Sequence, residues 1–181
     1  MVRYCRVYLI VFVLISCLLQ GAEDNLVEFS IVIPSYNNIK WVEQNLRSVI
    51  SQKYDNWHLY YYDDASTDGT GEFVDSFIKD NGLEDRCTVV HNSHRRGALA
   101  NFYTAIHSLR PENVVVMLDG DDKLANSCVL DTLARTYSDK EVWMTFGSFR
   151  KSGGILEGEV FGMGGQHEGL GAAIGGPLIG S

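Results

Sequence analysis

Short apolar runs that alternate with helical patterns constrain this chain more than any other feature. The clearest run is 113–118, Asn-Val-Val-Val-Met-Leu, and a stretch of this kind is typical of a buried strand. Further strands are predicted at 29–34, 57–62, 87–90 and 142–149. Helical spacing of apolar residues is found between them, at 42–50, 73–78, 99–109 and 126–137. The alternation predicts an α/β fold whose mostly parallel, Rossmann-like sheet carries helices on both faces.

The first residues of the chain have the pattern of a targeting segment. Arg3 and Arg6 precede the apolar stretch 7–19, which is shorter than the roughly 20 residues of a spanning helix. Residues 1–22 are therefore expected to be a signal peptide or a membrane anchor, with membrane association through 7–19 as an open possibility. Either reading places the protein in the secretory pathway, outside the cell or at a membrane, and a cytoplasmic face stays open.

The remaining chain divides into a folded part and a tail. Residues 151–181 are rich in glycine and are expected to be poorly ordered. We expect 27–150 to be one domain whose fold is incomplete at its C-terminus. Within it, Cys87 and Cys128 form either one disulfide or two thiols, and no cysteine pair has zinc spacing.

The acidic composition limits the partners. The formal net charge is −8 and the pI is near 5.0, whereas a nucleic-acid-binding protein needs a basic face. We therefore expect no nucleic-acid partner. A phosphorylated ligand remains compatible with this charge if a cation lies between the ligand and the protein.

Polar residues follow the predicted strands at the points where the strands end. Asn37 follows the first strand, Asp63 and Asp64 end the second, and 119–122 follows the fourth. Ligands of parallel sheets bind at the carboxyl ends of the strands, so these residues are expected to share one site. Asn38 is expected to cap the first helix with its side chain.

The segment Asp119-Gly-Asp-Asp122 is the strongest chemical signal. Its three carboxylates repel one another, and a cation would neutralise them. Carboxylate oxygens suit Mg²⁺ or Mn²⁺, which commonly also hold substrate phosphates. The alternative is a solvated acidic turn.

The second cluster, 63–70, has three interpretations. Asp64 could accept hydrogen bonds from a base or a sugar, or the cluster could be a turn that starts the next helix. A calcium loop would use Asp64, Ser66, Asp68 and Asp75, but that motif needs a preceding helix where a strand is predicted.

Four segments together resemble the family-2 inverting glycosyltransferases of the GT-A fold. They are Ser30-Ile-Val-Ile-Pro-Ser-Tyr-Asn37, Tyr62-Asp-Asp-Ala-Ser-Thr-Asp-Gly-Thr70, the Asn92…Gly97…Asn101 stretch and Asp119-Gly-Asp-Asp122. The resemblance covers 29–149 and holds in both order and spacing. It implies transfer of a sugar from a nucleotide-diphosphate donor, usually a UDP-sugar, to an acceptor that the sequence does not identify.

The resemblance also implies a donor site. The loop with Pro34, Tyr36 and Asn37 would border the nucleotide base and ribose. Asp63 and Asp64 would lie beside it, with Asp64 matching the carboxylate that contacts the base.

On the phosphate side, Arg95 or Arg96 lies where the family often places a cation near the donor. Asp119 and Asp121 look like the family's DxD motif, with Asp121 or Asp122 as the ligand of the metal that bridges the diphosphate.

The catalytic base has no candidate in this chain. Family members carry it in their second half, and Glu157, Glu159 and Glu168 of the tail lie in no suitable sequence context. The resemblance therefore leaves two expectations: a metal-assisted glycosyltransferase, or a truncated, non-catalytic module that binds a nucleotide sugar.

Overall fold

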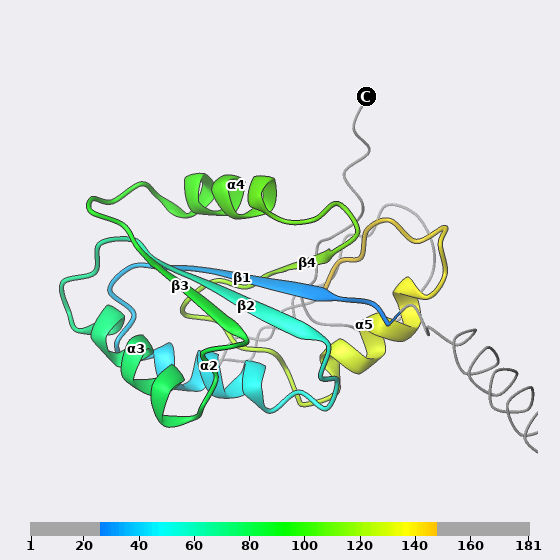
Figure 1. The fold of residues 1–181 in the computed structure, drawn as a ribbon, viewed down its shortest axis with the longest axis horizontal. Coiled ribbons are helices and arrows are strands. Elements are labelled where there is room, and N and C mark those ends of the chain that lie inside the picture. Colours follow the sequence, from blue (N-terminus) through cyan, green and yellow to red (C-terminus); the bar gives the residue numbers. More distant parts are fainter. Residues whose placement is uncertain (1–25, 148–181) are drawn as a thin grey trace, which may run out of the picture.

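The computed structural model describes residues 26–147 (Figure 1). The expectations for the leader 1–22 and for the tail 151–181 lie outside the described residues. Across the described range, none of the helices combines the length and the apolar character needed to cross a membrane. Cys87 and Cys128 are both free thiols, which decides between the two alternatives for them.

The core of the fold is a four-stranded parallel sheet. Its strands are β1 (Phe29–Ser35), β2 (Trp57–Asp63), β3 (Cys87–His91) and β4 (Val114–Met117), in the spatial order β3-β2-β1-β4. Every pairing is parallel, and Ile31 of β1 lies between Leu59 of β2 and Val116 of β4. The predicted α/β class and parallel sheet are confirmed.

Helices cover both faces of this sheet, as expected. The helices are α2 (Val42–Ile50), α3 (Thr70–Asp80), α4 (Ala98–Ser108) and α5 (Val129–Tyr137). In Figure 1, α2, α3 and α5 lie below the sheet and α4 lies above it. The chain builds outward from β1 to β3 and then returns to place β4 on the other side of β1. The reversal makes the β1/β4 boundary the switch point, where ligands of such sheets bind.

Side chains of β1 alternate between two apolar cores. Phe29, Ile31 and Ile33 belong to the larger core, which includes residues of α2, α3 and α5. Val32 belongs to the smaller core, which includes Phe102 of α4. A strand buried on both faces must be apolar at nearly every position, and this explains the nearly continuous apolar run in the sequence.

Two local expectations were wrong or incomplete at the first strand–helix junction. β1 continues one residue past Pro34 to Ser35. Asn38 starts the helix through its backbone, because its carbonyl accepts hydrogen bonds from the N–H groups of Trp41 (2.8 Å) and Val42 (2.9 Å). Its side chain donates to Ser35 Oγ instead (3.0 Å), so it does not cap the helix.

The strand predicted at 142–149 does not form over 142–147, and the last two residues of that range are not described. Trp143 and Phe146 are 68% and 47% exposed. Aromatic residues favour a strand locally, but a strand also needs a neighbour for its hydrogen bonds. Residues 142–147 pair with none of the four described strands, whose order ends at β4.

Candidate functional site

The loops after β1 and β2 are joined by four hydrogen bonds. The backbone N–H of Asn37 donates to Ser66 Oγ (2.9 Å), and Thr67 N–H donates to Asn37 Oδ1 (2.8 Å). The N–H of Ile39 donates to Asp68 Oδ2 (3.0 Å). The fourth bond runs from Asn38 N–H to Thr70 Oγ1 (2.9 Å). The two loops therefore form one rim at the carboxyl ends of adjacent strands.

This rim contains both non-glycine residues with positive φ in the described chain. Asn37 has φ 54° and Ala65 has φ 62°. Asparagine tolerates this region, whereas alanine does so at a steric cost. Gly69, with φ 92°, precedes α3 and needs the same freedom. Strained backbone concentrates at functional sites, which agrees with the position of the rim.

Asp64 is buried and holds the loop between β3 and α4. Only 2% of its surface is exposed. Its Oδ1 accepts hydrogen bonds from Asn92 Nδ2 (2.9 Å) and Arg96 N–H (2.8 Å), and its Oδ2 accepts one from Gly97 N–H (2.7 Å). Burial alone would raise the pKa of Asp64, but these donors outweigh it and lower the pKa to about 2. The Asn92 amide also bonds to Asn101 Oδ1 (2.8 Å), so the stretch singled out in the sequence surrounds this carboxylate.

The structure contradicts the calcium-loop alternative. The strand β2 precedes Asp64, where a calcium loop of that kind has a helix. The acceptors of Asp64 are directed at N–H donors of the protein itself. Asp68 stabilises the turn that starts α3, as the turn interpretation of this cluster proposed, because its Oδ1 accepts a hydrogen bond from the N–H of Thr70 (3.1 Å).

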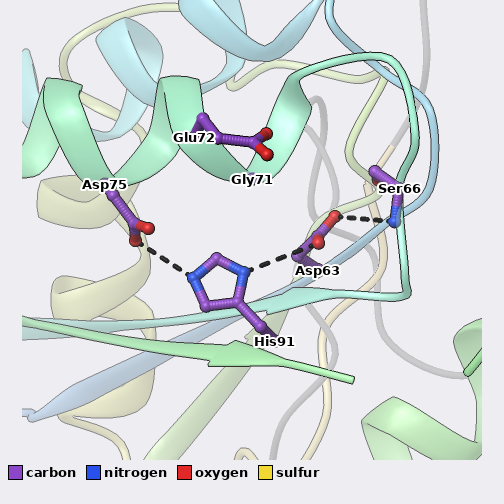
Figure 2. A pocket seen from close by; sticks show the side chains of 6 residues that line it. All are labelled: Asp63, Ser66, Gly71, Glu72, Asp75 and His91. Carbon is purple, nitrogen blue, oxygen red and sulfur yellow. Dashed lines mark hydrogen bonds and ion pairs between the residues drawn. The ribbon is translucent and has the colours of Figure 1, made fainter. Parts of the chain in front are cut away.

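Asp63 turns the other way, toward α3 (Figure 2). It lies in a hollow of about 200 Å³ that also involves His91 and Asp75. His91 Nδ1 is 3.5 Å from Asp63 Oδ2, and His91 Nε2 is 3.1 Å from Asp75 Oδ1. Burial would lower the pKa of His91, but the hydrogen bond to Asp75 and its charge, together with Asp63, raise it. His91 was not predicted as a site residue from the sequence, although its place at the end of β3 puts it on the same edge as Asp63.

The two arginines have different partners. Arg95 places its guanidinium carbon 4.1 Å from the centroid of the Tyr36 ring, across the rim. Arg96 instead lies along α4, where its Nη2 donates to Thr104 Oγ1 (3.1 Å). Of the two candidates, Arg95 is therefore the one whose side chain meets the loop after β1.

The acid loop, 119–122, follows β4 at the switch point. It is a tight turn, in which Asp122 N–H donates to Asp119 O (3.0 Å). A Cβ on Gly120 would lie 2.6 Å from Ser35 Oγ and 2.5 Å from Asn38 Nδ2, so the loop packs directly on the end of β1. Only glycine fits this approach.

Like charges crowd this loop. Asp119, Asp121 and Asp122 are all exposed, and no Lys, Arg or His within 26–147 forms an ion pair with them. Partial burial, followed by the charge of Asp121, raises the pKa of both Asp119 and Asp122. A bound cation would relieve this repulsion.

The carboxylates do not converge into a cage for a metal. No group of three or more His, Cys, Asp or Glu side chains in the described range is arranged to hold an ion. Mg²⁺ and ions like it are commonly bound by one or two carboxylates together with substrate phosphates. The donor set therefore fits a cation shared with a phosphorylated ligand, and it does not fit an all-protein site.

The candidate residues thus separate into two groups. Tyr36, Asn37, Arg95 and the acid loop lie at the exposed carboxyl edge of the sheet. Pro34, Asp63 and Asp64 are buried beneath it, and the two aspartates are occupied by partners within the protein.

Residues 30–157 match the model of a family described as glycosyl transferase family 2. The chain belongs to this family. The family 2 chain is 27% identical to the glycosyltransferase GlyG of Streptococcus pneumoniae over 120 residues, which are 66% of this chain and 38% of that protein. It is 35% identical to UDP-Glc:alpha-D-GlcNAc-diphosphoundecaprenol beta-1,3-glucosyltransferase WfgD of Escherichia coli over 104 residues, 55% of this chain and 36% of that protein. The chain thus spans well under half the length of these two relatives.

A solved structure supports the GT-A fold of this family 2 chain. The mannosyltransferase PcManGT of Pyrobaculum calidifontis, in complex with GDP-Man and Mn²⁺, superimposes with a TM-score of 0.62 at 24% identity. The match covers 68% of this chain and 36% of that one. The expected fold class and the resemblance to family 2 are therefore confirmed.

Proposed function

We propose that this domain binds a nucleoside-diphosphate sugar together with Mn²⁺ or Mg²⁺, as the donor site of a glycosyltransferase. The observation that carries the proposal is the packing of Gly120 on Ser35 and Asn38. It brings an acid loop that lacks a basic partner within 26–147 against the rim, where Tyr36 meets Arg95 of the loop before α4. A cation site and an aromatic, cationic wall at one edge of a sheet suit a nucleotide's phosphates and its base.

The rim would hold the nucleoside. Tyr36 offers a ring face for a base, and Arg95 offers a charge beside it. Asn37 keeps this loop in place through its bonds to Ser66 and Thr67. Asp64 acts by fixing the backbone of 92–97 through its bonds to Arg96 N–H and Gly97 N–H. Pro34 and Asp63 support the rim from below.

The acid loop would hold the diphosphate through a cation. Asp121 and Asp122 are the proposed ligands, and Asp119 adds charge beside them. When bound, the cation stabilises the negative charge that develops on the departing nucleoside diphosphate. The absence of a basic side chain paired with these carboxylates in 26–147 leaves them available for this role.

The relatives support a nucleotide-sugar donor. The name of WfgD specifies UDP-glucose, and the PcManGT structure contains GDP-Man and Mn²⁺. We propose UDP over GDP for this chain because the resemblance to the family implies a UDP-sugar donor and the name of WfgD agrees with it. The acceptor, the linkage and the catalytic base are left unassigned, and a module that binds the donor without transferring it remains the alternative.

Calorimetric titration of the full chain with UDP and with GDP, each with Mn²⁺ and with EDTA, tests the proposal. We expect UDP to bind more tightly than GDP and Mn²⁺ to strengthen binding. A folded sample that binds neither nucleotide would contradict it. Incubation with UDP-sugars then separates the two alternatives, because an enzyme releases UDP by transfer or slow hydrolysis and a binding module does not.

A further inference from the structure

A buried asparagine contacts the acid loop from the side opposite to its carboxylates. Asn45 lies on α2, and its Nδ2 donates hydrogen bonds to two backbone carbonyls, Asp119 O (3.0 Å) and Asp122 O (2.8 Å). These are the first and last residues of the tight turn closed by the bond from Asp122 N–H to Asp119 O. One side chain therefore fixes both ends of the loop.

The same side of α2 holds the segment that follows. Ser48 Oγ accepts a hydrogen bond from Leu124 N–H (3.0 Å). Gln52, just beyond the helix, donates to Asn126 O (2.6 Å) and accepts from Leu130 N–H (3.0 Å). Together with Asn45, these residues recur at helical spacing and bind the backbone between β4 and α5 along its length. The acid loop is the end of this row.

Asn45 is an energetically costly residue at its position. It is fully buried beside the apolar Val42, Leu46 and Val49 of the same helix. Its Oδ1 has no hydrogen-bond partner within the described residues, and an unsatisfied buried acceptor costs about 1–3 kcal/mol. Within the described residues, the Asn45 side chain therefore forms its hydrogen bonds only through Nδ2, and both of them are to the acid loop.

The contacts orient the loop for a ligand. With the carbonyls of Asp119 and Asp122 turned toward α2, the side chains of the loop remain exposed at the sheet edge. Gly120 allows the same loop to pack closely against Ser35. A loop held on two sides keeps its carboxylates in place despite their mutual repulsion.

We infer that Asn45 is a positioning residue for the divalent cation: it fixes the acid loop so that Asp121 and Asp122 present their oxygens to the ion. The inference rests on the proposed function. Loss of a residue that orients metal ligands commonly costs about 10–100-fold in metal affinity. The predicted defect is therefore in the cation's contribution to nucleotide binding, and nucleotide binding without metal is spared.

The test compares Asn45→Ala with Val49→Ala in the full chain. Val49 is fully buried on the same helix and is absent from the row of polar contacts, so its variant controls for a weakened α2. For each protein, the Kd of UDP is measured calorimetrically with Mn²⁺ and with EDTA. We expect Asn45→Ala to reduce the Mn²⁺ enhancement about tenfold and to leave the Kd in EDTA unchanged, while Val49→Ala keeps the wild-type enhancement.

The other outcomes contradict either the proposed function or the inference about Asn45. If the wild-type chain shows no Mn²⁺ enhancement, the proposed function fails and this inference falls with it. If the wild type shows the enhancement and Asn45→Ala retains it, only the inference is wrong. Equal losses in Asn45→Ala and Val49→Ala also overturn it, because the effect then belongs to the helix as a whole.

A second measurement uses only the wild-type chain, so it does not depend on whether a variant folds. In the wild-type chain, the side-chain amide signals of Asn45 are followed by NMR during titration with Mg²⁺ in the presence of UDP. We expect them to shift, while those of Asn113 stay constant. Asn113 is a matched control, since it is also buried but bonds to Ser30 Oγ (2.8 Å) just before β4, away from the acid loop. A shift of the Asp121 backbone amide without any shift at Asn45 would overturn the inference.

Discussion

The guanidinium carbon of Arg95 lies 4.1 Å from the centroid of the Tyr36 ring. The contact joins the loop after β1 to the loop before α4, which are far apart in the chain. Cation–π contacts of this kind contribute about 0.5–1 kcal/mol when exposed. The contact therefore contributes little to stability, and its main effect is to set one wall of the proposed nucleotide site.

We expect Tyr36→Ala to weaken UDP binding about fivefold or more, because the ring offers the base a stacking surface worth about 1–3 kcal/mol. Arg95→Ala should weaken it less, and the double variant should lose less than the sum of the two, since each residue positions the other. Calorimetry measures these affinities. Tyr103→Ala is the control, because Tyr103 is 63% exposed on α4 and should leave UDP affinity unchanged.

Replacing Asp64 should loosen the loop 92–97. Asp64→Asn loses charged hydrogen bonds to Arg96 N–H and Gly97 N–H, and we expect it to lower the free energy of unfolding by about 2–3 kcal/mol at neutral pH. Urea unfolding measures the change. The exposed Asp85 provides the control, since Asp85→Asn should shift stability by less than about 0.5 kcal/mol.

The Asp64 effect should depend on pH with a definite sign. The pKa of Asp64 is lowered from 3.8 to about 2 on folding, so its stabilisation is fully present above pH 3.8 and is lost as the pH falls toward 2. The difference between wild type and Asp64→Asn in urea should shrink over that window. A difference that stays constant down to pH 2 would show that the ionised carboxylate is not its source.

His91 should titrate above its ordinary value because of Asp75 and Asp63 (Figure 2). Because the pKa of His91 is raised on folding, the stabilisation from its contacts with Asp75 and Asp63 is fully present below pH 6.5. It is lost as the pH rises through the folded-state pKa of His91. Asp75→Asn should lower the pKa of His91 in an NMR titration and cost only a few tenths of a kcal/mol, because the pair is exposed. His58 serves as an internal control whose titration should not move.

Gly120→Ala should destabilise the domain by about 1–3 kcal/mol, because the new Cβ would meet Ser35 and Asn38. A double-mutant cycle with Ser35→Gly tests the cause. Removing the Ser35 side chain takes away two of the close contacts, so the double variant should lose less than the sum of the single losses. Strictly additive losses would show that Gly120 is required for a different reason.

Asp121→Asn should have opposite effects without and with a cation. Without metal it removes like charge from beside Asp119 and Asp122 and should raise stability by up to about 0.5 kcal/mol. With Mn²⁺ and UDP present, the wild-type chain should gain stability by binding and the variant should gain much less. Urea unfolding under both conditions measures the two changes, and a variant that gains as much as wild type would exclude Asp121 as a ligand.

Much of this fold follows from the sequence because burial leaves a clear pattern. The strand from Val114 is apolar throughout, the one from Phe29 is apolar except at Ser30 and Ser35, and each is covered on both faces. The segment with Trp143 and Phe146 shows where the pattern is insufficient. Aromatic residues favour a strand locally, whereas pairing depends on a neighbouring strand that composition does not reveal.

The candidate site was predictable in its location and less so in its contacts. The carboxyl-end rule predicted that the acid loop and the rim lie at one edge of the sheet, and the structure has both at that edge. It could not distinguish Asp63 from Asp64, which diverge toward His91 and toward Gly97 because neighbouring residues at a strand end point to opposite faces. Asn45 was missed for another reason: a polar residue among apolar helix positions shows its purpose only once its two carbonyl partners are known.

The hydrogen bonds between the loops after β1 and β2 have a consequence for how relatives of this domain can diverge. Hydrogen bonds match Asn37 to Ser66 and Thr67, and they match Ile39 to Asp68. An insertion in either loop would break this matching, so length variation is expected elsewhere, at the exposed turn after α3 for example. A change of nucleotide preference along this lineage should therefore proceed by exchange of single side chains within loops of constant length.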